Sequence, residues 1–146
     1  MQTKIIDGAM IASEIKDDLK KQVKGLKEKG ITPGLAVVLV GDNSASKVYV
    51  GNKKKACEYV GIKSFSYELP ENTSEDSLLE LIDTLNQDEK VHGILVQMPL
   101  PRHMDEQKVI KAIAPHKDVD GFHIENAGAL LVGAPGFISC TPAGII

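Results

Sequence analysis

The sequence predicts an α/β protein of three layers, in which helices flank a mostly parallel sheet. Two continuous apolar runs, at residues 35–40 and 93–96, are typical of strands that are covered on both faces. Segments with apolar residues every three or four positions alternate with these runs, as expected of amphipathic helices. Because the links between the segments are short, the alternation favours parallel strands joined by crossover helices. A chain of 146 residues is long enough to bury a hydrophobic core as one domain.

A long amphipathic helix is predicted at about residues 9–29, and Gly30 ends it. A turn follows the strand at 35–40, and Ser44 is a candidate N-cap for a second helix. That helix is expected to run to about Val60, where a glycine ends it. The regularly spaced apolar residues of the first helix are Ile11, Ile15, Leu19, Val23 and Leu26.

Four further elements continue the alternation. A weaker strand is predicted at 63–69, and a third helix begins near residues 72–75. The strand at 93–96 comes next, followed by a short helix at 105–113. The apolar residues of the third helix are Leu78, Leu79, Leu81, Ile82 and Leu85.

The last part of the chain is less regular. Residues 118–140 have frequent glycine and proline, so we expect irregular structure with a short strand near Phe137 and Ile138. Thr141 as a cap and Pro142 at the first helical position then predict the start of another helix. One turn is too short to be stable alone, which indicates that the chain is the front part of a longer protein.

The composition excludes several classes of protein. Hydrophobic residues make up 42% and charged residues 25%, which is ordinary for a globular protein. No apolar run approaches the roughly 18 residues of a membrane helix, and no signal peptide is recognisable. With 4% aromatic residues and a net charge of −3, nothing indicates a nucleic-acid partner. The two cysteines form no framework and the four histidines are scattered, so we expect a reducing cytoplasm and no metal site.

A lone polar residue, Gln97, ends the apolar strand at 93–96. Pro99 and Pro101 follow, and because each fixes φ and lacks an N–H, the sheet cannot continue past Met98. Ligands of open α/β sheets bind just outside the carboxyl ends of the strands. Gln97 therefore marks either a ligand site or a strand end whose amide caps backbone groups.

Tyr49 and Lys53 are four residues apart on the second predicted helix and therefore share a face. A tyrosine can stack on a flat ligand, whereas a lysine exchanges protons near neutral pH only if its pKa falls from about 10.4. The alternative is that Lys53 is solvated, as we expect for Lys54 and Lys55. The Tyr-x-x-x-Lys spacing also occurs in short-chain dehydrogenases, but residues 1–40 lack the Gly-rich phosphate loop of that class.

Asp118 and Asp120 are two residues apart and precede Gly121. This pattern predicts a turn with an aspartate as cap. The alternative is that one carboxylate faces the ligand site and accepts from ring N–H or amino groups. A metal site is disfavoured because no third ligand is evident.

Taken in order, the motifs resemble the folate-binding domain of the bifunctional methylenetetrahydrofolate dehydrogenase/cyclohydrolase family. The resemblance covers the whole chain. Two departures are Gly51, where the family commonly has a larger residue, and Ser139, where it has proline. The motifs are Tyr49-Val50-x-x-Lys53, Asn86-x-Asp88, Ile94-Leu95-Val96-Gln97-Met98-Pro99-Leu100-Pro101, Lys117-Asp118-Val119-Asp120-Gly121 and Cys140-Thr141-Pro142.

The resemblance implies a role for each of four residues. Lys53 would be the general acid/base of the cyclohydrolase step, and Gln97 would hydrogen-bond and tune it. Tyr49 would stack on the folate, and Asp120 would anchor the pterin ring. The further residues that the resemblance places at the substrate are Val50, Val96, Met98, Leu100 and Pro101.

The resemblance also implies a domain organisation. Residues 1–140 would be the tetrahydrofolate-binding catalytic domain, and 141–146 would begin the helix that leads to a Rossmann domain for NADP, absent from this chain. The complete protein would be a homodimer that oxidises 5,10-methylenetetrahydrofolate with NADP and hydrolyses the product to 10-formyltetrahydrofolate. The alternatives are a single-activity or NAD-dependent relative and a folate-binding module without catalysis.

Overall fold

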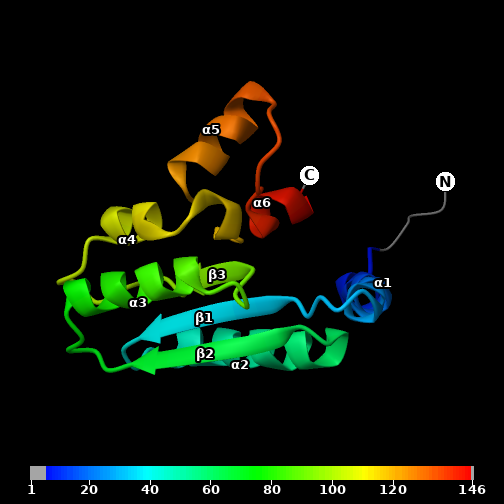
Figure 1. Ribbon diagram of the computed structural model, residues 1–146, viewed down its shortest axis with the longest axis horizontal. Helices are drawn as coiled ribbons and strands as arrows, with labels where there is room; N and C mark the ends of the chain where they lie inside the picture. The colour runs from blue at the N-terminus through cyan, green and yellow to red at the C-terminus, as the bar shows by residue number, and fades with distance from the viewer. Residues whose placement is uncertain (1–5, 146) are drawn as a thin grey trace.

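Three parallel strands form the centre of the fold (Figure 1). The computed structural model describes residues 6–145, and in this range the strand order is β2-β1-β3. The strands are β1 (Gly34–Val40), β2 (Lys63–Leu69) and β3 (Gly93–Val96). The helices α2 (Ser44–Val60) and α3 (Glu75–Gln87) connect them. The predicted α/β class, its parallel sheet and its flanking helices are confirmed.

Alternate residues of β1 point to opposite faces of the sheet, which is why the whole strand is apolar. Val37 and Leu39 pack with Val50 of α2 on one face. The other face is covered by α3 and by the chain that follows β3. The buried residues of this larger cluster include Ala36, Val38, Val40, Leu78, Ile82, Leu85, Ile94, Val96 and Leu100.

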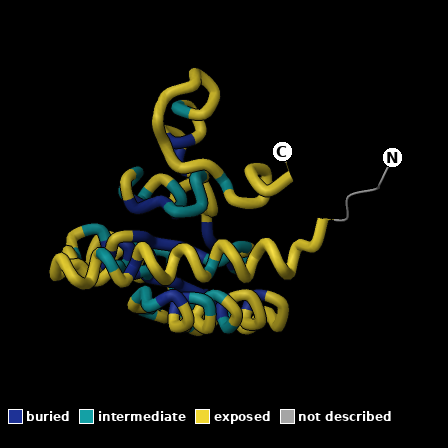
Figure 2. Tube along the Cα trace, turned by 90° about the vertical axis from the view of Figure 1, so that its right-hand side faces the viewer, coloured by how far each residue is buried: buried dark blue, intermediate teal, exposed yellow. Residues whose placement is uncertain are grey.

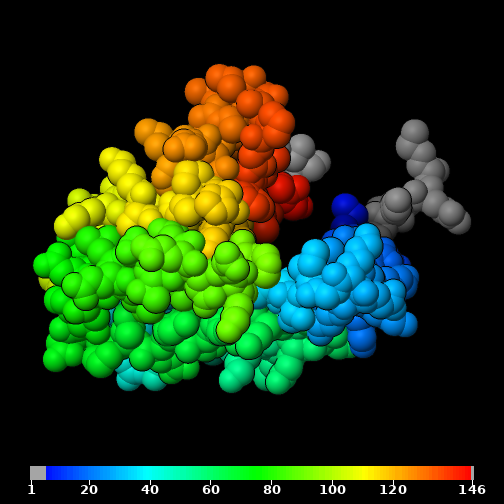
Figure 3. Space-filling view, viewed as in Figure 1, coloured from blue at the N-terminus to red at the C-terminus, as the bar shows by residue number. Residues whose placement is uncertain are grey.

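The remaining helices surround this core. The long helix α1 (Gly8–Glu28) lies beside α2, and most of it is exposed to solvent (Figure 2). Its only buried residue is Val23. The helix α5 projects from the body of the molecule (Figure 3). None of the helices in residues 6–145 has the length and apolar character that a membrane crossing requires. The other helical segments are α4 (Glu106–Ala112), η1 (Pro115–Lys117), α5 (Ile124–Val132) and α6 (Cys140–Ile145).

The region predicted to be irregular contains a helix, and this prediction was wrong. Residues 124–132 form α5, which begins after His123 and ends at Gly133 with φ +72°. The strand expected at Phe137 and Ile138 is not present among the described residues. Instead, the backbone N–H of Phe137 donates to the side chain of Asn126, and not to a neighbouring strand.

Two predicted helix starts shift along the chain. Asn43, not Ser44, is the N-cap of α2, because its side-chain oxygen reaches the N–H of Ser46 at 3.0 Å. The last helix begins at Cys140 rather than after Thr141, and its first turn closes from the carbonyl of Ser139. The other predicted elements agree with the observed bounds within about two residues, the usual uncertainty of helix ends.

Candidate active site

Gln97 and Lys53 meet at the carboxyl end of the sheet. The N–H of Gln97 donates to the carbonyl of Val38 at 2.8 Å, which continues the ladder one residue past β3. Because Gln97 follows Leu95 by two residues, its side chain leaves the sheet on the face that α2 covers. There Nζ of Lys53 donates to Oε1 of Gln97 at 2.9 Å.

The amide of Gln97 has a fixed orientation. Its Nε2 donates to the backbone carbonyl of Met98 at 2.8 Å, which leaves Oε1 as the atom that faces Lys53. The reading of Gln97 as a residue that caps a backbone group is confirmed, and its reading as part of a ligand site stays a prediction. As an acceptor, Oε1 holds the lysine nitrogen at one place beyond the strand.

Tyr49 lies one turn before Lys53 on α2 and is 61% exposed, so its ring is accessible to a ligand. Val50 is buried against β1 and fixes how α2 is rotated on the sheet. Lys53 is partly buried, whereas Lys54 and Lys55 are exposed as predicted. The lysine that differs from its neighbours is therefore the one that contacts Gln97.

The predicted turn at Asp118–Gly121 is present. Asp118 pairs with Ile94 in parallel fashion, which places this segment along the free edge of β3. The N–H of Gly121 then donates to the carbonyl of Asp118 at 3.3 Å, and Gly121 has φ +67°. The turn displays Asp120 at the same end of the sheet as Gln97.

The two aspartates of this turn have different surroundings. Burial raises the pKa of Asp120, the positive charge of Lys53 acts in the opposite direction, and the negative charge of Asp118 adds to the increase. Asp120 is therefore within electrostatic range of Lys53, although the two come from different elements. Asp118 is only 2% exposed, and its Oδ2 accepts from the N–H of His123 at 2.8 Å and from Nδ2 of Asn126 at 2.9 Å.

Four of the predicted site residues lie at one end of the sheet: Tyr49, Lys53, Gln97 and Asp120. The side chains of three other predicted site residues point elsewhere. Val96, Met98 and Leu100 pack into the core on the α3 side, opposite to Lys53. Pro101 is partly buried in the link to α4. Any contact of Val96 or Leu100 with a ligand would involve backbone atoms, and these assignments stay predictions.

Lys117 and Asn126 are buried polar residues to which the sequence reasoning gave no role. Nζ of Lys117 donates to three carbonyls at the end of α3, those of Leu85 (3.0 Å), Asn86 (2.7 Å) and Asp88 (2.9 Å). This anchors the chain just before Asp118. A lysine directly before the Asp-Val-Asp-Gly run gave no sequence signal that distinguishes it from a solvated lysine.

The described residues do not fit a dinucleotide phosphate or a metal ion. The link from β1 to α2 holds one glycine, Gly41, and the side chain of Glu71 lies against it. Asp42 follows directly, so acidic groups stand where a phosphate would approach. Within residues 6–145, no three His, Cys, Asp or Glu side chains are grouped as metal ligands.

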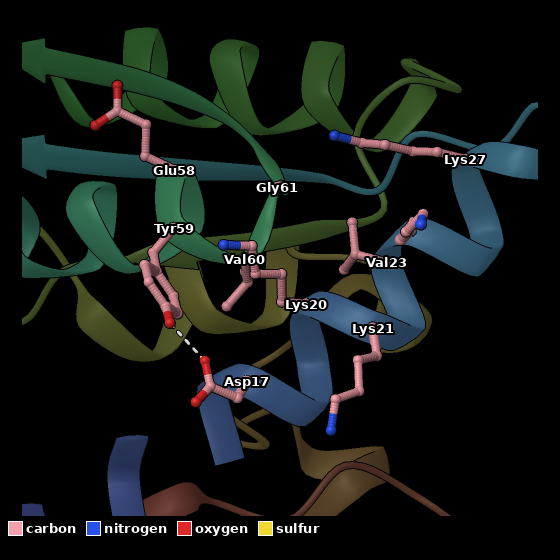
Figure 4. A pocket seen from close by; sticks show the side chains of 10 residues that line it. Asp17, Lys20, Lys21, Val23, Lys27, Glu58, Tyr59, Val60 and Gly61 are labelled. Carbon is pink, nitrogen blue, oxygen red and sulfur yellow. Dashed lines mark hydrogen bonds between the residues drawn. The ribbon is translucent and has the colours of Figure 1, made fainter. Parts of the chain in front are cut away.

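A groove of about 770 Å³ between α1 and α2 is not the candidate site (Figure 4). Its side chains contact one another: the hydroxyl of Tyr59 donates to Asp17, and Nζ of Lys20 lies 4.5 Å from the centre of the Tyr59 ring. These contacts account for the packing of α1 on α2. The groove does not include Lys53 or Asp120.

Comparison with known proteins shows which family the chain resembles. The family model for the tetrahydrofolate dehydrogenase/cyclohydrolase catalytic domain matches residues 6–120. The bifunctional protein FolD of Agathobacter rectalis is 62% identical over 142 residues, which is 97% of this chain and 51% of the relative.

Two solved structures share the fold. That of the bifunctional enzyme FolD from Campylobacter jejuni has a TM-score of 0.93 and 52% identity, and the match covers 95% of this chain and 50% of that one. The methylenetetrahydrofolate dehydrogenase-cyclohydrolase of Trypanosoma brucei, complexed with NADP cofactor and inhibitor, has a TM-score of 0.94 and 34% identity, over 99% of this chain and 50% of that one.

The chain therefore spans about half the length of the relatives that it matches. The resemblance drawn from the sequence motifs is confirmed by the family model and by these relatives. The chain belongs to the tetrahydrofolate dehydrogenase/cyclohydrolase family, and it matches the catalytic domain of that family.

Proposed function

We propose that this chain is the folate-binding catalytic domain of a bifunctional enzyme of one-carbon metabolism. The complete enzyme oxidises 5,10-methylenetetrahydrofolate to 5,10-methenyltetrahydrofolate with NADP and hydrolyses this product to 10-formyltetrahydrofolate. The observation that carries the proposal is the contact of Lys53 with Gln97, with Asp120 in electrostatic range. Residues 1–140 form the catalytic domain in this proposal, and 141–146 begin the connection to the NADP-binding part. Residues 1–5 and Ile146 lie outside the described residues.

Lys53 is the proton carrier of the hydrolytic step. Water adds to the cationic methenyl carbon, and Nζ of Lys53 takes one proton from that water. The same nitrogen returns this proton to the ring nitrogen as the bond between the ring nitrogen and the carbon breaks, and the remaining hydroxyl proton is released to solvent as the formyl carbonyl forms. The positive charge of the methenyl bridge disfavours a second positive charge beside it, which favours the neutral amine in the complex. Gln97 supports this step because its oxygen holds the lysine nitrogen in place.

Asp120 and Tyr49 orient the substrate. The carboxylate of Asp120 accepts from pterin N–H groups, and the exposed ring of Tyr49 stacks on the folate. Val50, Val96, Met98, Leu100 and Pro101 form the rest of the pocket, with Val96 and Leu100 contributing backbone atoms.

NADP binds to the part of the enzyme that lies beyond the residues described here, because the strand-to-helix link after β1 is not a Gly-rich phosphate loop. The NADP complex of the Trypanosoma brucei relative supports NADP rather than NAD. We also place the enzyme in the cytoplasm as a homodimer that contributes to purine synthesis. The two unpaired cysteines, Cys57 and Cys140, fit a reducing compartment.

The test is to assay the complete purified enzyme for both steps. NADP reduction with methylenetetrahydrofolate and hydrolysis of methenyltetrahydrofolate are both expected. Folate binding without either reaction would make the chain a binding module. Reduction of NAD in place of NADP, or one reaction without the other, would favour a specialised relative.

A further inference from the structure

Asn126 of α5 is a buried side chain whose nitrogen and oxygen both make hydrogen bonds. Nδ2 donates to Oδ2 of Asp118 and to the carbonyl of Pro115, each at 2.9 Å. Oδ1 accepts from the N–H of Phe137 at 3.2 Å. One side chain thus joins the segment before the Asp120 turn to the strap, which we define as residues 137–139.

The backbone of the strap also packs closely against the turn at Gly121. A Cβ on Gly121 would lie 2.8 Å from the carbonyl oxygen of Phe137 and 3.0 Å from the nitrogen of Ser139. Gly121 also has φ +67°, a conformation that residues with side chains rarely adopt. The turn is therefore held from two sides, by Asn126 through Asp118 and by the strap across Gly121.

The sheet alone does not fix the position of Asp120 relative to Lys53. Lys53 belongs to α2, whereas the Asp120 segment is held on β3 by the bridge between Ile94 and Asp118 and by the packing of Val119 against the cluster around Leu95, both of which end one residue before Asp120. Lys117 anchors the chain before the turn, and His123 at the start of α5 and the strap contact the turn from its other side. Buried hydrogen-bond networks of this kind fix geometry when all their members are satisfied.

We propose that Asn126 is a positioning residue that, by tying Asp118 to the strap, fixes where the carboxylate of Asp120 stands opposite Lys53. The inference rests on the proposed role of Asp120 as the group that binds the pterin ring. Asn126 acts through Asp120 and does not itself contact the folate. α5 is then the element that holds the substrate anchor in place.

A double-mutant cycle in the complete enzyme tests this role. Asn126→Ala should weaken the binding of a folate analogue by about three- to ten-fold in isothermal calorimetry, the usual scale for coupled residues. In an Asp120→Ala background the same change should alter affinity by less than about two-fold. Asn126→Leu, which keeps a similar size but makes none of these hydrogen bonds, should show the same pattern and separates their loss from the cavity that the alanine variant creates.

Asn86→Ala is a matched control. Asn86 is partly buried and, like Asn126, uses both side-chain atoms: it donates to the carbonyl of Ala112 at 2.8 Å and accepts from the N–H of Ala114 at 2.9 Å. It should lower the melting temperature as Asn126→Ala does but leave folate affinity within about two-fold.

Equal affinity losses from the Asn126 changes in both backgrounds, or no loss in the parent, would overturn the positioning role. So would an equal loss from Asn86→Ala. If Asp120→Ala alone left affinity unchanged, the proposed role of Asp120 would fail first, and the inference with it.

Discussion

Asp118 and Asp120 are two residues apart, yet their surroundings assign them different tasks. Asp118 is fully buried, and its Oδ2 accepts hydrogen bonds from His123 and Asn126. Asp120 is partly buried and lies within range of the Lys53 charge. The first carboxylate therefore holds the fold, and the second is available to a ligand.

Substitution of each aspartate should separate the two tasks. A carboxylate that accepts from ring N–H groups contributes roughly 1.5–3 kcal/mol for each hydrogen bond. Asp120→Ala should therefore weaken folate binding about ten-fold or more with little change in melting temperature. Asp118→Ala should lower the melting temperature more and the affinity less. Titration of both variants with a folate analogue checks this, and a larger affinity loss at Asp118 would reverse the assignment.

The pH dependence of stability gives a second test of Asp120. Because burial raises its pKa in the folded state, the folded protein keeps the Asp120 proton to higher pH than the unfolded chain does. The contribution of Asp120 to stability is therefore present at low pH and lost as pH rises through the folded-state pKa. Asp120→Asn should become more stable than the parent as pH rises above about 4. Denaturant unfolding of both proteins across this range measures the difference, and a parent that gains relative stability with pH would refute it.

At the scale of elements, Lys117 joins the end of α3 to the start of the Asp120 segment. Its Nζ donates to the carbonyls of Leu85 and Asn86 at the helix end, and it shares the carbonyl of Asp88 with the N–H of Val91. Lys117→Met should lower the free energy of unfolding by at least about 2 kcal/mol, because buried carbonyls lose charged donors. Lys90→Met, at an exposed lysine near the same end of α3, should change it by less than about 0.5 kcal/mol. Equal effects in denaturant unfolding would contradict the anchoring role.

The sequence predicted those helices and strands in which the apolar residues follow one regular pattern. The leucines of α3 and the apolar run of β1 are such cases, and both were located within about two residues. The run from Ala127 to Val132 is apolar or glycine throughout, so no polar face marks it as a helix. The left-handed Gly133 at its end was the available signal, and it was read as part of an irregular stretch.

The candidate site was partly predictable for a related reason. The sequence predicted that Gln97 lies at the carboxyl end of a strand and that Tyr49 and Lys53 share one helix face, and the structure brings Lys53 and Gln97 into contact. Strand alternation determines that Val96 points to the α3 side of the sheet, whereas Leu100 lies beyond the strand and its direction follows from the turn at Pro99. Asn126 could not be predicted, because its role depends on a contact with Asp118 that only the folded chain makes.

At the scale of the whole molecule, we proposed that NADP binds to a part of the enzyme other than this chain, and this predicts that the chain alone does not bind NADP. The described residues have no Gly-rich phosphate loop, and acidic side chains line the link after β1. The 146-residue chain should therefore show no measurable NADP binding in calorimetry. Micromolar binding of NADP to this chain would contradict the assignment of the cofactor site to the other part of the enzyme.

The central claim is that Lys53, held by Gln97, moves the proton in the hydrolytic step. The most direct measurement is the turnover of methenyltetrahydrofolate by the complete enzyme and by its Lys53→Met variant. Turnover should fall by at least about 10²-fold, the usual scale for general acid–base catalysis, while folate binding is kept. Lys54→Met, at the exposed neighbouring lysine, should leave turnover unchanged. Turnover of Lys53→Met within a few-fold of the parent enzyme would show that Lys53 is not the acid/base.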